Sequence, residues 1–209
     1  MRTYPIMLLV ADRLAVVVGA GPVGLRKASA LVRAGACVRL VARDVPEDAP
    51  VEGVEVVRGD YQEDLLAGAF LVFACTDDRG LNARISRDAR RAGALVNVAD
   101  LPAECDFFLP ATVRDGPVVV AVGTGGAAPA AAAWLKRRIA EALPPRVAEF
   151  LAALDEARAA LHATVEEPSR RMAAMKALAN DETYRAFLQD GPETLRRRLR
   201  ERSQAPEET

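Results

Sequence analysis

A glycine-rich turn that directly follows a buried strand constrains the fold of this chain more than any other feature of its sequence. Leu14–Val18 is an uninterrupted apolar run rich in β-branched residues, which is typical of a strand buried on both faces. The spacing Gly-x-Gly-x-x-Gly follows at residues 19–24, and Leu25–Ala34 has the pattern of a helix that Gly35 ends. This order of strand, glycine turn and helix predicts a dinucleotide-binding turn.

Each glycine of the turn has its own expected role. Gly19 allows the tight turn, Gly21 lets a pyrophosphate approach the backbone, and Gly24 lets the helix pack closely on the strand. The helix then begins, and its free N–H groups and positive dipole end favour an anion. We therefore predict that the cofactor is bound by Gly19, Gly21, Pro22, Val23 and Gly24. The alternative is a tight turn between strand and helix that binds nothing.

The first half of the chain continues to alternate between strand and helix. Repeated alternation of this kind predicts parallel strands joined by crossover helices. The expected fold class is therefore α/β, with a Rossmann-like parallel sheet domain over residues 1–112. Its further strands are expected at Cys37–Ala42, Val54–Val57, Phe70–Cys75 and Leu95–Val98, and its second helix at Leu81–Arg91.

The second half of the chain has a different pattern. Val118–Val122 is strand-like, Pro129–Leu143 is an alanine-rich helix, and from Arg146 onward only helical spacing recurs. We expect a small middle segment at residues 113–145, a helical C-terminal domain at 146–203 and a frayed tail at 204–209. The helices of the C-terminal domain are expected to be separated at Pro168-Ser169, at Asn180-Asp181 with Asp181 as the cap, and at Gly191-Pro192.

Composition and charge exclude several classes of protein. Hydrophobic residues make up 51% of the chain and charged residues 27%, which excludes disorder over the whole chain. The formal net charge of −1 gives no electrostatic case for binding nucleic acid or a membrane surface. Cys37, Cys75 and Cys105 are widely spaced, so neither a disulfide framework nor a cysteine metal site is expected. A reducing compartment, the cytoplasm, fits this cysteine usage.

One stretch without charged residues, 116–135, is just long enough to span a bilayer. Gly123, Gly125, Gly126 and Pro129 interrupt it, which favours a strand, a glycine turn and a helix. The N-terminus has no small-residue cleavage site after an apolar core, so no signal peptide is expected. We therefore expect no membrane segment.

Polar residues follow the later strands of the expected sheet. Thr76 and Asp77 close the fourth strand, and Asn97 and Asp100 lie at the end of the fifth. The carboxyl ends of parallel strands face the ligand crevice of such a sheet. These four residues are therefore expected near a bound cofactor.

The end of the second strand bears on which cofactor is bound. An acidic residue there suits the ribose of NAD, whereas a basic residue suits the 2′-phosphate of NADP. Arg43 and Asp44 stand together at this point, so the local signal is ambiguous. Asp44 lies about twenty residues beyond the glycine turn, where the acidic residue is expected. The alternative is that both are solvated loop charges.

Several segments together resemble the siroheme synthase family, which comprises NAD-dependent precorrin-2 dehydrogenases, many of them also sirohydrochlorin ferrochelatases. The matching segments occur in the family's order over residues 4–140, and their combination is more specific than any one of them. They are Tyr4-Pro5 followed by an apolar strand, the turn from Gly19 to Lys27, Ala74–Asp78 with Asn82, Asn97–Pro102 running into Cys105-Asp106-Phe107, and Gly125-Gly126 with Pro129.

The resemblance implies an NAD-binding domain, a middle segment that forms a homodimer, and a helical domain that helps to enclose a tetrapyrrole between subunits. It implies oxidation of precorrin-2 to sirohydrochlorin and permits insertion of Fe²⁺ to give siroheme. No uroporphyrinogen methyltransferase region follows, so the chain resembles the standalone form. Thr124 stands where the family often has serine. The implied sites are Asp100 for catalysis, Asp44, Thr76, Asp77 and Asn82 for the cofactor, and Asn97, Thr124 and Gly125 for the substrate.

Oxidation of precorrin-2 requires a hydride acceptor and a group that accepts a proton. NAD would take the hydride, and a carboxylate beside it could take the proton or stabilise charge in the ring. Asp100 is the best placed carboxylate in the sequence, and its alternative role is that of a cap or turn residue beside Pro102. Asp106 is more typical of a local structural residue.

Other charged residues carry weaker signals. A substrate rich in carboxylates calls for arginines, but those between Arg196 and Arg202 cover several sides of one helix and are more typical of a solvated face. His162 is the only histidine and is expected at the surface, so no metal site is predicted. Two other functions stay open: an NAD-binding sensor or regulatory module without catalysis, and a dehydrogenase for another small substrate.

Overall fold

The computed structural model describes residues 3–125 and 128–203 and divides the chain into two units, Met1–Leu109 and Pro110–Thr209. The predicted tail at 204–209 and Gly126 lie outside the described residues. The predicted division into three parts, with boundaries after residues 112 and 145, stays a prediction.

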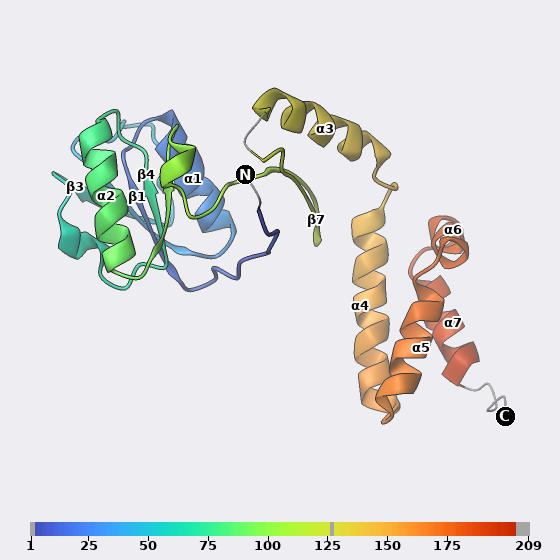
Figure 1. Ribbon diagram of the computed structural model, residues 1–209. Helices are drawn as coiled ribbons and strands as arrows, with labels where there is room; N and C mark the ends of the chain where they lie inside the picture. The colour runs from blue at the N-terminus through green and yellow to red at the C-terminus, as the bar shows by residue number, and fades with distance from the viewer. Residues whose placement is uncertain (1–2, 126–127, 204–209) are drawn as a thin grey trace. The chain divides into compact units, whose positions relative to one another are not determined.

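The first unit contains a parallel sheet, as predicted (Figure 1). The strand order is β3-β2-β1-β4-β5, and every neighbouring pair is parallel. The order reverses between β1 and β4, and ligands of such sheets bind beyond the carboxyl ends of the strands at that point. The strands are β1 (Leu14–Val18), β2 (Cys37–Ala42), β3 (Val54–Arg58), β4 (Leu71–Ala74) and β5 (Leu95–Val98).

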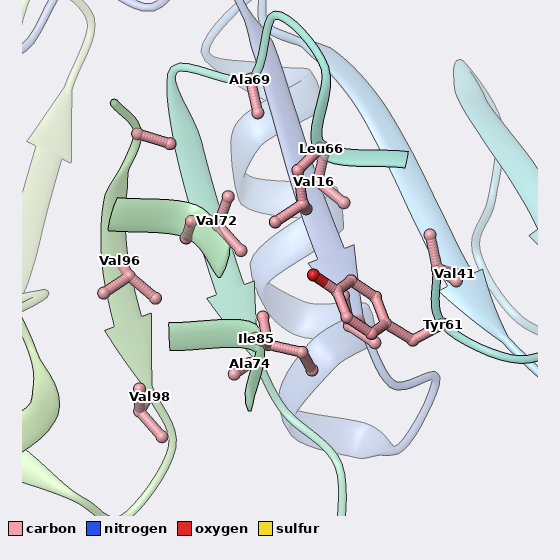
Figure 2. Packing of buried hydrophobic residues seen from close by; sticks show 13 residues of the cluster. Val16, Val41, Tyr61, Leu66, Ala69, Val72, Ala74, Ile85, Val96 and Val98 are labelled. Atoms are coloured by element: carbon pink, nitrogen blue, oxygen red, sulfur yellow. The ribbon is translucent and has the colours of Figure 1, made fainter. Parts of the chain in front are cut away.

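Two helices cover the two faces of this sheet. The alternate residues of each strand point to opposite faces, so each helix packs on its own apolar cluster. Helix α1 (Pro22–Arg33) contributes Ala28 and Leu31 to one cluster, and α2 (Arg79–Arg91) contributes Ile85 and Ala89 to the other. Figure 2 shows Ile85 among the strand valines of this second cluster. The short helices η1 (Glu63–Leu66) and η2 (Pro102–Glu104) lie in connections.

A buried carboxylate joins α2 to the segment before η1. Asp88 of α2 is 2% exposed and accepts a hydrogen bond from the hydroxyl of Tyr61 at 3.0 Å. Arg91 donates to its other oxygen at 2.5 Å, and Arg84 lies at 3.5 Å. Burial raises the pKa of Tyr61, and the hydrogen bond to Asp88 adds to this increase. The tyrosine is therefore a neutral donor that satisfies the buried carboxylate.

The second unit combines a two-stranded ribbon with helices (Figure 1). The strands β6 (Ala111–Asp115) and β7 (Val118–Val122) are antiparallel, and α3 (Pro129–Ala142) packs on them. Around Phe150, Leu178, Phe187 and Leu195 the remaining helices form a separate core. They are α4 (Val147–Thr164), α5 (Pro168–Leu178), α6 (Asp181–Asp190) and α7 (Glu193–Ser203).

The uncharged stretch 116–135 contains β7 and the beginning of α3. Within the described residues, no helix has both the length and the apolar character needed to cross a membrane.

Two expectations about strands need correction. The apolar strand expected after Tyr4-Pro5 is not one: residues 3–10 have no regular secondary structure, and Ile6 and Leu9 are exposed. The run pairs with neither edge strand of the sheet, β3 or β5, and so stays outside it. Strand β6 was not predicted, because Ala111–Asp115 has no continuous apolar run and owes its pairing to β7.

The starts of α1, α2 and α6 also differ from the prediction, and α2 begins at Arg79 rather than at Leu81. Helix α1 begins at Pro22 rather than at Leu25, because proline is well suited to the first helical position. Asn180, not Asp181, caps α6, and its side-chain oxygen accepts from the N–H of Thr183 at 2.8 Å. Asp181 is instead the first residue of that helix, where a negative charge interacts favourably with the helix dipole.

Candidate active site

The glycine turn between β1 and α1 has the geometry of a phosphate cradle. A Cβ at Gly19 would lie 2.4 Å from the carbonyl oxygen of Cys75, and one at Gly24 would lie 2.0 Å from that of Gly19. Both positions therefore exclude a side chain, and Gly19 also has a φ of +107°. A Cβ at Gly21 would meet nothing within 4 Å. The turn is thus closely packed at its first and third glycines and open at its second, where a pyrophosphate would approach.

The beginning of α1 supplies donors at this opening. Gly21 is the N-cap residue and has no side chain to bond the first N–H groups of the helix. Pro22 and Val23 are exposed at this end. The N–H groups of a first helical turn have no partner within the helix, so they are available to an anion. The residues present therefore fit a dinucleotide pyrophosphate.

The loop after β4 is held by the side chains of Thr76 and Asn82. The Asn82 side-chain oxygen accepts from the Thr76 hydroxyl at 2.7 Å, and its nitrogen donates to the Thr76 carbonyl at 2.8 Å. Asp78 caps α2 by accepting from the N–H of Leu81 at 3.0 Å. Asn82 is 3% exposed, whereas Asp77 is exposed at the tip. Asn82 thus fixes the shape of the loop, and its direct contact with a cofactor stays a prediction.

A third residue contacts one member of the ambiguous pair at the end of β2. Arg43 forms an ion pair with Asp60, which follows β3. The hydrogen bond from Arg43 to Asp60 raises the pKa of the arginine above its ordinary value. Asp44 is exposed beside this pair. The charge of Arg43 is therefore partly balanced, while the Asp44 carboxylate stands at the strand end.

Asp100 occupies a turn with unusual backbone geometry directly after β5. Its φ is +59°, a left-handed conformation that aspartate and asparagine tolerate better than most residues. Its side chain is exposed. Burial raises the pKa of the Cys75 thiol; the nearby Lys27 ammonium group lowers it, and the negative charge of Asp100 adds a smaller increase. The N–H of Ala99 donates to the Ala74 carbonyl at 2.9 Å, so Asp100 follows β5 near Cys75, the residue whose carbonyl lies against the glycine turn.

The loop that follows Asp100 returns to the edge of β5. The N–H of Asp106 donates to the Val96 carbonyl at 2.8 Å, and its side chain accepts from the N–H of Val96 at 2.9 Å. Arg90 of α2 donates to the same carboxylate and to the carbonyl of Glu104. As expected from sequence, Asp106 has local structural contacts here.

Sequence reasoning gave no role to Lys27, although it belongs to the segment that resembles the family. Its ammonium group donates to the side-chain oxygen of Asn97 at 2.6 Å and lies 5.2 Å from the centre of the Phe73 ring. Asn97 itself is 7% exposed. One signal in the sequence could have pointed to Lys27: it is one of only three lysines, with Lys136 and Lys176, among the 28 Lys and Arg residues.

The remaining predicted site residues belong to the second unit. The hydroxyl of Thr124 donates to the Ala128 carbonyl at 3.3 Å, and Gly125 has a φ of +62°. Their contact with substrate stays a prediction. The arginines of α7 form ion pairs with carboxylates: Arg196 with Glu156 and Glu193, Arg197 with Asp190, and Arg198 with Glu182. His162 is exposed on α4, and the described part of the chain has no group of three or more potential metal ligands.

The strand order, the glycine cradle and the helix that starts from it define a nucleotide-binding domain of the Rossmann class. A family model described as "Putative NAD(P)-binding" matches residues 6–111, about half of the chain, and the chain belongs to that family.

Comparison with curated proteins extends this likeness beyond the first unit. The chain is 35% identical over 206 residues to a siroheme synthase of Pseudomonas paraeruginosa, covering 97% of this chain and 44% of that protein. It is 42% identical over 148 residues to the siroheme synthase of Pseudomonas aeruginosa, covering 69% of this chain and 32% of that protein. The resemblance to siroheme synthases is confirmed, and the chain spans less than half the length of these relatives.

A solved structure shares the fold of nearly the whole chain. The structure titled "SirC, precorrin-2 dehydrogenase" superposes with a TM-score of 0.78 at 20% identity, covering 95% of this chain and 100% of that one. At this identity the match confirms the α/β fold class.

Proposed function

We propose that this chain oxidises precorrin-2 to sirohydrochlorin with NAD⁺, in the pathway to siroheme. The observation that carries the proposal is the position of Asp100. Its carboxylate is exposed in a left-handed turn at the carboxyl edge of β5, directly after Ala99, whose N–H donates to the Ala74 carbonyl next to Cys75 and the glycine cradle. The similarity to siroheme synthases over 97% of the chain supports the choice of a tetrapyrrole substrate.

The reaction removes two electrons and two protons from precorrin-2. When bound, NAD⁺ accepts the hydride and becomes NADH. The second hydrogen leaves as a proton, and Asp100 accepts it from the macrocycle or stabilises the charge that develops there. Gly21 and the N-terminus of α1 would hold the pyrophosphate, and Thr76, oriented by Asn82, would line the crevice beside it.

We propose NAD⁺ rather than NADP⁺ as the acceptor. The Asp44 carboxylate would repel a ribose 2′-phosphate, and Arg43, which could attract one, is paired with Asp60. Replacing Asp60 with alanine should free Arg43 and increase kcat/KM with NADP⁺ relative to NAD⁺, whereas Asp48→Ala in the same connection should change neither. Equal turnover of the wild-type protein with both cofactors would contradict the proposal.

Iron insertion is the second activity to test, because the curated relatives are named siroheme synthases. In that step Asp100 would accept protons from the pyrrole nitrogens as Fe²⁺ enters.

We also propose a cytoplasmic homodimer built on residues 113–145, where Trp134 is 53% exposed on an alanine-rich helix. Light scattering at micromolar concentration measures this state, and a monomer would contradict it.

Anaerobic incubation with precorrin-2 and NAD⁺, with and without Fe²⁺, separates these possibilities. A dehydrogenase produces NADH, measured by absorbance at 340 nm, in step with the spectrum of sirohydrochlorin. An added Fe²⁺-dependent conversion to siroheme would establish the second activity. An NAD-binding sensor or regulatory module would bind the cofactor, shown by calorimetry, without forming NADH, and would overturn the proposed function.

A further inference from the structure

Lys27 links the helix that follows the glycine turn to β5, the strand that directly precedes the turn at Asp100. It lies on α1, one turn beyond Gly24, and side chains of a helix lean toward its N-terminus. Its ammonium group is 2.6 Å from the Asn97 side-chain oxygen and 5.2 Å from the centre of the Phe73 ring. These contacts with β4 and β5 take the charge away from the solvent and into the sheet face below the crevice.

Asn97, which accepts the hydrogen bond from Lys27, also contacts the far end of the loop that contains Asp100. Its side-chain nitrogen donates to the carbonyl of Phe107 at 2.9 Å and lies 3.6 Å from the sulfur of Cys105. The Cys105 thiol in turn contacts the N–H and carbonyl of Val98 at 3.2 and 3.3 Å. The amide of Asn97 therefore joins Lys27 on one side to the returning end of the loop on the other.

Resting on the function proposed above, we propose that Lys27 is a positioning residue for Asp100. Through Asn97 it holds the loop of residues 99–107, so that the left-handed turn at Asp100 keeps its carboxylate at the crevice. This gives Asn97 a positioning role in place of the substrate contact that its sequence position suggested. A hydrogen bond from a charged donor suits this task because it is stronger than one between neutral groups.

The choice of lysine over arginine follows from the geometry. The ammonium group is a compact donor that serves one amide oxygen and one aromatic face at the same time and also interacts with the Cys75 thiol. A planar guanidinium would need room for five donors in a half-buried position. In a chain whose basic residues are nearly all arginine, we therefore expect Lys27→Arg to fail to replace the lysine.

The first test measures the loop without using catalysis. Iodoacetamide labelling, followed by mass spectrometry, gives the alkylation rate of each cysteine: exposed Cys37 is an internal reference, and Cys105 reports the loop. In Lys27→Met, Cys105 should be alkylated about tenfold faster than in the wild type, with Cys37 unchanged. The matched control Arg33→Met removes an exposed charge from the same helix and should leave both rates unchanged. An unchanged Cys105 rate in Lys27→Met would overturn the proposal.

A substitution at Asn97 separates the two halves of the connection. Asn97→Asp keeps an oxygen for Lys27 but loses the donor to the Phe107 carbonyl, so it should speed alkylation of Cys105 as Lys27→Met does. It also keeps the charge of Lys27 paired, which protects the fold. The double variant should label no faster than either single variant, because both interrupt one connection. Additive rates would show independent effects and contradict the proposal.

Measurements of turnover then test whether Lys27 affects the oxidation of precorrin-2. Lys27→Met should lower kcat with precorrin-2 about tenfold while KM for NAD⁺ and the calorimetric Kd stay unchanged, and Lys27→Arg should not restore kcat. Loss of NAD⁺ binding would make Lys27 a cofactor residue and overturn the positioning role. If the wild-type protein forms no NADH, the proposed function fails, whereas the labelling result still decides whether Lys27 holds the loop.

Discussion

The first unit holds a buried aspartate and a half-buried lysine in contacts between elements, whereas the ion pairs of the second unit lie at its surface, within one helix or between helices. In the first unit, Asp88 of α2 is buried against Tyr61, and Lys27 of α1 reaches Asn97 of β5. In the second, Arg138 pairs with Glu141 and Arg158 with Asp155, each three residues apart on an exposed surface. Contacts between elements fix one geometry, whereas pairs within a helix support only that helix.

This difference matches what each unit must provide. A cofactor site depends on the relative position of several strand ends, so the first unit needs contacts that tie α1, α2 and β5 together. The helices of the second unit pack on a smaller core around Phe150 and Phe187 and leave large side chains such as Met172 exposed. We therefore expect single substitutions in the first unit to have the larger consequences.

The largest effect should come from Asp100. Asp100→Asn removes the charge but keeps a residue that tolerates the φ of +59°, so the turn should survive. Loss of general acid–base help should lower kcat for precorrin-2 oxidation by about 10²–10⁴-fold, with the NAD⁺ Kd unchanged. Single-turnover absorbance and calorimetry measure the two quantities.

Two comparisons make this prediction decisive. Asp48→Asn, at an exposed position in the connection after β2, is the matched control and should turn over as the wild type does. Asp100→Ala should be as inactive as Asp100→Asn, since both lack the carboxylate. A folded Asp100→Asn protein with wild-type turnover would remove Asp100 from the site.

The next effect is on stability and compares the two units directly. Asp88→Ala leaves the buried Tyr61 hydroxyl without its acceptor and removes the carboxylate that Arg84 and Arg91 share, so it should lower the free energy of unfolding by about 2–4 kcal/mol. Asp155→Ala removes the partner of Arg158 on an exposed helix face and should cost about 0–1 kcal/mol. Urea unfolding followed by circular dichroism measures both. Equal losses would contradict the contrast between the units.

A smaller effect is expected at the open glycine. Gly21 has φ −70°, and a Cβ there would meet nothing within 4 Å, so alanine fits the turn without strain. Gly21→Ala should therefore keep wild-type stability but weaken NAD⁺ binding about tenfold, because its methyl group occupies the approach of the pyrophosphate. Gly24→Ala should instead destabilise the fold, because its Cβ would lie 2.0 Å from the Gly19 carbonyl. Unchanged NAD⁺ affinity in Gly21→Ala would move the pyrophosphate elsewhere.

The sequence predicted best those features that depend on local pattern. The apolar run Leu14–Val18 and the glycines after it locate β1 and the start of α1, because both signals lie within one short segment. The apolar run at residues 6–10 was wrongly predicted as a strand, because an apolar pattern alone does not show whether a segment finds a partner in the sheet. Strand β6 was not predicted, because its own residues lack an apolar run and its strand conformation depends on pairing with β7.

The site shows the same division between local and distant information. The glycine turn and the residues at strand ends could be named because their place along the chain fixes their edge of the sheet. The roles of Lys27 and Asp60 could not, because each depends on a partner far away in sequence: Asn97 in one case and Arg43 in the other. No local spacing encodes such pairs.

The smallest effect we expect is at Glu149, near the beginning of α4 in the second unit. Arg146 donates to its carboxylate, at 2.7 Å for the shortest contact, and this hydrogen bonding lowers the pKa of Glu149 below its ordinary value of 4.5. A carboxylate with a lowered folded-state pKa contributes stability above its unfolded pKa and loses that contribution as the pH falls through the folded value. Glu149→Gln should therefore be slightly less stable than the wild type at pH 7 and equal to it well below pH 4.5. Fluorescence of Trp134, the only tryptophan, follows urea unfolding from within the second unit. A larger loss at pH 7 than that of Asp88→Ala would reverse the ranking of the two units.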